Sequence, residues 1–135
     1  MKRTARILVV DDNEASAMVF ALALSLAGYE VRDSYSGKQA VAIASEFLPD
    51  VAFLDLGIPL MNGFEIAARF RETPGLADVV LIAVTGFSGE DAQERTRAAG
   101  FRHHLVKPVE PEVLRRTLCD MGFPPPSPSP KRRVR

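Results

Sequence analysis

The stretch ARILVVDD at residues 5–12 indicates how this chain folds. A short, β-branched apolar run that ends abruptly in acidic residues is typical of a buried strand. Similar runs occupy 51–54 and 79–84, and two weaker ones, at 30–34 and 102–106, each follow a glycine placed to end a helix. We therefore expect five strands, with the two weaker runs at the edges of the sheet.

Helical patterns alternate with these strands. Ser36 and Gln39 have the spacing of a capping box in front of one of them. The order (βα)₅ with short connections predicts an α/β fold, a doubly wound parallel sheet covered by helices on both faces. The helical patterns lie at 14–27, 37–47, 64–71 and 90–99, and a last one opens at Glu110-Pro111. Because the 90–99 pattern has only alanines at its apolar positions, we expect that helix to dock weakly and to be mobile.

Length and composition indicate one folded domain. The chain has 135 residues, of which 47% are hydrophobic and 25% charged, and Cys119 is its one cysteine, to which we assign no role. No apolar run approaches the roughly 18 residues of a membrane span, and acidic residues follow the first strand too soon for a signal peptide, so we expect a cytoplasmic protein.

The net charge of zero is unevenly distributed. Residues 124–135, PPPSPSPKRRVR, carry four basic residues and no acid, which leaves 17 − 4 = 13 basic against 17 acidic residues in 1–123. An acidic body is not that of a nucleic-acid-binding domain. We expect a domain over 1–123 and an extended, solvated, Pro-rich tail over 124–135.

Residues suited to phosphoryl chemistry follow four of the expected strands. Ligands of an open parallel sheet bind at the carboxyl ends of its strands, and these ends carry Asp11-Asp12, Asp55, Thr85-Gly86 and Lys107-Pro108. Three carboxylates crowded at one edge repel one another, so a cation is expected, and an all-oxygen site with few protein ligands suits Mg²⁺. Asp55 could attack phosphorus, with Lys107, the hydroxyl of Thr85 and the N–H of Gly86 stabilising the transferred oxygens. Taken singly, each of these residues also suits a helix cap, a turn or a surface charge.

The motifs also resemble a known family. The segments ILVVDDN at 7–13, DLGIPLMNG at 55–63, VTG at 84–86 and AAGFRHHLVKP at 98–108 are similar, in order and spacing, to receiver domains of bacterial two-component response regulators, the CheY-like superfamily. The resemblance covers roughly residues 4–120, and residues 83–111 resemble most the receivers of hybrid sensor kinases.

This resemblance implies a flavodoxin-like sheet of strand order 2-1-3-4-5 and a role in a phosphorelay. Asp55 would accept a phosphoryl group from a phosphohistidine on a histidine kinase or phosphotransfer protein. Asp11, Asp12, Asp55 and the backbone carbonyl of Gly57 would hold Mg²⁺, Thr85 would be the switch hydroxyl, and Lys107 would pair with the phosphate. We expect a signalling phosphoacceptor rather than an ordinary enzyme, one that assists its own phosphorylation and dephosphorylation.

Three positions depart from the family pattern. Gly86 stands where many receivers have Ala, which widens access to the expected phosphoryl pocket. His104 stands where Tyr or Phe commonly reports phosphorylation, and Val109 replaces a frequent Phe. We expect His103 and His104 to be a strand-end pair with one ring packed and the other exposed, and without a metal or phosphotransfer role.

Two other functions compete with the phosphoacceptor. A phosphatase of the haloacid-dehalogenase type shares the strand-end nucleophile but needs a second Asp two residues later, where this chain has Gly57. A degenerate receiver that acts only through protein contacts would not need the acids and Lys107, all of which are present. A nucleotide-binding module is disfavoured because no glycine-rich phosphate motif follows the first strand. Since Met1 stands just before that strand and no DNA-binding or other output domain follows the tail, we expect a stand-alone receiver, although an excised domain would look identical.

Overall fold

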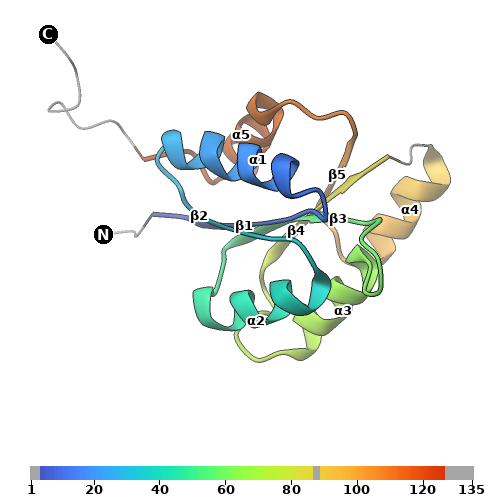
Figure 1. The fold of residues 1–135 in the computed structure, drawn as a ribbon. Helices are drawn as coiled ribbons and strands as arrows, with labels where there is room; N and C mark the ends of the chain where they lie inside the picture. The colour runs from blue at the N-terminus through green and yellow to red at the C-terminus, as the bar shows by residue number, and fades with distance from the viewer. Residues whose placement is uncertain (1–3, 87–88, 127–135) are drawn as a thin grey trace, which may run out of the picture.

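A five-stranded parallel sheet forms the centre of the molecule (Figure 1). The computed structural model describes residues 4–86 and 89–126. The strand order is β2-β1-β3-β4-β5, which confirms the predicted flavodoxin-like topology and places both weaker strands at the edges. The strands are β1 Arg6–Val10, β2 Glu30–Ser34, β3 Val51–Asp55, β4 Val80–Thr85 and β5 His103–Val106.

In the described part of the chain, five helices cover the two faces of this sheet. Figure 1 shows α1 and α5 on one face and α2, α3 and α4 on the other. Their bounds are α1 Glu14–Leu26, α2 Gly37–Phe47, α3 Gly63–Glu72, α4 Glu90–Ala98 and α5 Pro111–Asp120. The predicted helices thus all form, with ends that differ by a residue or two.

The sheet separates two hydrophobic cores. Successive side chains of a strand point to opposite faces, so Ile7 and Val9 of β1 pack with α1 and α5, while Leu8 and Val10 pack with α2 and α3. All five residues of β3 are buried, as expected for the central strand of a sheet covered on both sides. This burial fixes the position of the residues at its carboxyl end.

Helix starts are set by side-chain caps. The Ser36 side chain accepts the N–H of Gln39 at 3.2 Å, as its spacing predicts. The Gln39 side chain accepts the N–H of Tyr35 at 2.9 Å, whereas in a regular capping box it would accept the N–H of Ser36 itself. A complete capping box, missed in the sequence, starts α3 between Asn62 and Glu65.

Helix α4 is held by few contacts. Its buried residue is Thr96, rather than one of the alanines that the apolar pattern suggested. The guanidinium of Arg95 also stacks over the ring of Phe64, 5.0 Å from its centre. The predicted weak docking is consistent with this packing, and the mobility of α4 stays a prediction.

The chain after α5 returns to the end of α1. The Tyr29 hydroxyl donates to the carbonyl of Phe123 at 2.5 Å, and a Cβ added to Gly28 would lie 2.9 Å from Cγ of Pro126. Residues 124–126 therefore lie against the domain, and the rest of the expected tail is outside the described residues. Among the helices in the described ranges, none is long and apolar enough to cross a membrane.

Truncating one leucine of the α5 core tests this packing. Leu118 is fully buried, whereas Leu26 at the end of α1 is 77% exposed. Leu118→Ala should lower the free energy of unfolding by about 2–5 kcal/mol, because it removes buried methyl groups and leaves a cavity. The control Leu26→Ala should change it by less than about 0.5 kcal/mol. Equal losses in urea unfolding would contradict the described core.

Candidate functional site

Three carboxylates meet where β1 and β3 end. One oxygen from each of Asp11, Asp12 and Asp55 lies within 4.8 Å of the other two. Asp11 and Asp55 are only 3% and 6% exposed, whereas Asp12 is exposed to solvent. The strand register explains the convergence, because β1 and β3 are neighbours that run in parallel and end at the same edge.

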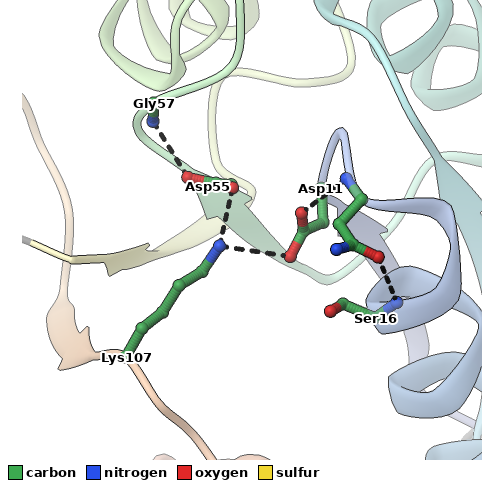
Figure 2. A network of polar contacts seen from close by, with 6 residues as sticks. Asp11, Ser16, Asp55, Gly57 and Lys107 are labelled. Carbon is green, nitrogen blue, oxygen red and sulfur yellow. Dashed lines mark hydrogen bonds and ion pairs between the residues drawn. The ribbon is translucent and has the colours of Figure 1, made fainter.

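The turn after β1 holds Asp11 in place. Its Oδ1 accepts the backbone N–H of Asn13 at 2.9 Å (Figure 2). Asn13 is in turn the N-cap of α1, since its side chain accepts the N–H of Ser16 at 3.0 Å. Sequence reasoning assigned Asn13 no part in the site, although an Asn directly before a helical pattern is a recognisable cap.

Asp55 is fixed through both of its carboxylate oxygens. Oδ1 accepts the N–H of Gly57 at 2.9 Å, and Oδ2 accepts from Nζ of Lys107 at 2.8 Å. The chain folds tightly behind it, because a Cβ on Gly63 would lie 3.0 Å from the Asp55 carbonyl oxygen and 2.9 Å from Cα of Leu56. Only glycine fits at that close approach.

Lys107 links the two buried acids. Figure 2 shows its ammonium between them, 2.8 Å from Oδ2 of Asp55 and 3.4 Å from Oδ2 of Asp11. Its backbone N–H donates to the carbonyl of Thr85 at 2.7 Å, which ties the end of β5 to the end of β4. The peptide bond between Lys107 and Pro108 is cis, as the sequence allowed.

The electrostatics of the cluster shift two of its groups. Burial raises the pKa of Asp11; the N–H of Asn13 and the charge of Lys107 oppose this rise, and the charge of Asp55 adds to it. Burial acts to lower the pKa of Lys107, but the hydrogen bond and charge of Asp55, with those of Asp11, outweigh it and raise that pKa. The charge of Asp55 thus acts to raise the pKa of both groups.

Thr85 and Gly86 lie at the end of β4, which pairs with β3, the strand that carries Asp55. Thr85 is buried and pairs in register with Val106 of β5. A Cβ added to Gly86 would meet nothing within 4 Å, so this position leaves open space. Wider access to a phosphoryl pocket stays a prediction.

The two histidines of β5 differ in environment as predicted. His103 is exposed and His104 is half-buried, with its Nδ1 3.5 Å from Oγ1 of Thr96 on α4. His104 pairs in register with Ala83, two residues before Thr85, so its side chain lies on the same face of the sheet as that of Thr85.

The oxygen donors match a hard divalent cation. Carboxylate oxygens are the ligands that Mg²⁺ and Ca²⁺ prefer, and few protein ligands suit Mg²⁺, which keeps part of its water shell. Asp11, Asp12 and Asp55 are thus in position to hold such an ion, and the carbonyl of Gly57 as a fourth ligand stays a prediction.

Comparisons with known proteins agree with this geometry. The family described as "Response regulator receiver domain" matches residues 7–118. The chain is 32% identical over 111 residues to the response regulator PleD of Caulobacter vibrioides, and the aligned region covers 82% of this chain and 24% of PleD. It therefore spans about a quarter of that relative. It is 30% identical over 106 residues to the polar-differentiation response regulator DivK of Brucella ovis, covering 78% of this chain and 86% of DivK.

A solved structure extends the likeness to three dimensions. The chemotaxis protein CheY4 of Vibrio cholerae superposes with a TM-score of 0.82 at 30% sequence identity, over 87% of this chain and 98% of that one. Sequence match, strand order and acidic cluster point to one origin, and the chain belongs to the response regulator receiver domain family.

Proposed function

We propose that Asp55 accepts a phosphoryl group from a phosphohistidine on a histidine kinase or phosphotransfer protein. The observation that carries this proposal is the setting of the Asp55 carboxylate. It is nearly buried, held by the N–H of Gly57, and 2.8 Å from the ammonium of Lys107, with two further carboxylates beside it. The phosphoacceptor signalling role follows from the family, and the assignment to these residues is ours.

The transfer exchanges one bond to phosphorus for another. A carboxylate oxygen of Asp55 attacks phosphorus in line, the bond from phosphorus to the donor's imidazole nitrogen breaks, and that nitrogen keeps the electron pair. The product on Asp55 is an acyl phosphate, which water later hydrolyses to restore the carboxylate. The hydrogen bond from the N–H of Gly57 restricts rotation of the Asp55 carboxylate. The entropy cost of orienting the nucleophile for the reaction is therefore smaller.

Charge on the transferred oxygens has to be neutralised. Lys107 supplies one positive charge already aimed at Asp55. A Mg²⁺ ion held by Asp11, Asp12, Asp55 and the carbonyl of Gly57 would offset the charge of the three carboxylates and of the phosphoryl oxygens.

Phosphorylation then changes a protein-binding surface. The acyl phosphate would carry a charge of about −1.5 to −2 in place of the −1 of the ionised Asp55 carboxylate. It would lie at the end of β3, next to the end of β4, where Thr85 is buried. We propose that the hydroxyl of Thr85 turns to the phosphoryl group and that the lightly packed α4 shifts with β5. His104 would take the place of the usual aromatic reporter, since it contacts α4 on the face that Thr85 shares.

The same proposal covers the extent and setting of the domain. The receiver would occupy 1–123, with 124–135 as a tail, and would act in the cytoplasm with no activity beyond its own phosphorylation and dephosphorylation. Gly57 offers no side-chain acid for the second step of a haloacid-dehalogenase-type phosphatase. Turnover of many phosphate monoesters per chain would favour that enzyme instead.

Replacing Asp55 tests the phosphoacceptor directly. Asp55→Asn should lose Mg²⁺-dependent labelling by radioactive acetyl phosphate, because an amide is a poor nucleophile towards phosphorus. Asp78→Asn, which changes an exposed Asp outside the site, should be labelled like the original protein. Stoichiometric labelling of Asp55→Asn would refute the assignment, and no labelling of the unaltered protein would favour a degenerate receiver.

Thermal unfolding with and without Mg²⁺ tests the metal site. An ion that binds only the folded chain adds about 2.7 kcal/mol of stability at 100 times its Kd. Asp11→Asn should abolish most of this gain. Because the pKa of Asp11 is raised above its ordinary value of 3.8, ionisation of Asp11 favours the unfolded chain as pH rises through that range. Asp11→Asn should therefore also be more stable than the unaltered protein at pH 7 without Mg²⁺. An undiminished Mg²⁺ response in the variant would count against this site.

The hydroxyl of Thr85 is testable apart from phosphorylation. Thr85→Ala should accept label from acetyl phosphate, but the amide signals of α4 and β5 should shift much less on phosphorylation than in the unaltered protein. Thr85→Ser, which keeps the hydroxyl, should restore most of the shift. A full response of α4 and β5 in Thr85→Ala would show that the switch uses another group.

A further inference from the structure

A hollow between α4 and β5 lies apart from the carboxylate cluster. Its volume is about 230 Å³. Gln93, Thr96 and Arg97 of α4 line one side of it, and residues 101–104, which lead into β5, line the other. None of these residues belongs to the site of phosphorylation proposed above.

The lining of this hollow is basic. It holds the guanidiniums of Arg97 and Arg102 and the imidazoles of His103 and His104, and no acid. Within 4–86 and 89–126, neither guanidinium has a salt-bridge partner. This stands out because residues 1–123 as a whole carry more acids than bases. The charges fit a negatively charged group from outside the chain.

Thr96 is held in place beneath the hollow by its contacts. Thr96 is 2% exposed, and its hydroxyl donates to the carbonyl of Gln93 at 2.9 Å and lies 3.5 Å from Nδ1 of His104. The buried ring of Phe101 forms the apolar part. A partner group would therefore meet a preformed surface between two elements.

The neighbouring charges limit the size of the partner. A second hollow shares Gln93 and Arg97 with this one and is otherwise lined by Glu90, Asp91 and Glu94 of the same helix. A long polyanion such as nucleic acid would extend over these three acids and be repelled, whereas a segment that places one or two carboxylates between Arg97 and Arg102 need not cover them. The hollow is also smaller than the roughly 300–1,000 Å³ of typical small-molecule pockets, so it suits one or two side chains.

We infer that this hollow binds the carboxylate side chains of a short acidic peptide segment on a partner protein. The guanidiniums of Arg97 and Arg102 would pair with the carboxylates, and the histidines and Gln93 would add hydrogen bonds. The inference rests on the proposed function in one respect, that the α4–β5 side is the surface that phosphorylation changes. His104 connects the two, since it lines the hollow and lies on the sheet face of Thr85.

A peptide titration followed by NMR tests this inference. A hexa-glutamate peptide added to the unphosphorylated full chain should shift the signals of residues 93–104 saturably, and a hexa-glutamine peptide should not. The double variant Arg97→Gln/Arg102→Gln should bind the peptide at least about tenfold more weakly, because charge-assisted hydrogen bonds are lost. Arg69→Gln, an exposed arginine of α3 that does not line the hollow, should bind like the unaltered protein.

Four results would overturn it. The first is undiminished peptide binding by the double variant with its circular dichroism unchanged, and the second is binding of hexa-glutamine as tight as that of hexa-glutamate. The third is displacement of the peptide by inorganic phosphate at concentrations similar to those of the peptide, which would indicate a small-anion site. The fourth is sedimentation showing that the shifts arise from pairing of two copies of the chain. Since the protein in this titration is unphosphorylated, a failure here leaves the assignment of Asp55 intact. If Asp55 fails to accept phosphate, the peptide titration still shows whether the hollow binds an acidic segment.

Discussion

One ammonium group offsets the mutual repulsion of three carboxylates at the carboxyl edge of the sheet. Asp11 and Asp55 are nearly buried, and buried charges are costly unless they are paired. Lys107 pairs with both, and in doing so it joins the segment after β5 to the ends of β1 and β3. The ionised cluster of three acids and one lysine still carries −3 + 1 = −2, the charge that a divalent cation cancels.

The fold makes this arrangement possible and, under the proposed function, would let it respond to phosphorylation. The central strands are buried on both faces and place Asp11 and Asp55 at their carboxyl ends, whereas α4 at the side of the sheet buries mainly Thr96. Under the proposed function, the charge added at Asp55 would act at the end of a buried strand in a domain whose α4 is lightly held. Such a difference in local stability is what a switch between two arrangements requires.

Much of this could be predicted from the sequence, for physical reasons. Strand–helix alternation leaves few topologies, and parallel strands bring their carboxyl ends to one edge, so Asp11, Asp12, Asp55, Thr85 and Lys107 were expected there. The sequence could not show that Asp55 and Thr85 are still strand residues, because strand ends depend on pairing with neighbours. It also could not show that Lys107 contacts two acids at once, or that a threonine anchors α4. The basic hollow was missed because Arg97 and Arg102 come together only when α4 folds beside β5.

The most direct measurement of the central claim is the position and amount of the acyl phosphate. The chain would be phosphorylated by a phosphohistidine donor in the presence of Mg²⁺, reduced with borohydride, which converts an aspartyl phosphate to homoserine, and sequenced by mass spectrometry. We predict homoserine at position 55 alone, approaching one per chain at saturation. Homoserine at position 11 or 12, or unmodified aspartate at all three positions under conditions in which the donor is active, would contradict the claim that Asp55 is the phosphoacceptor.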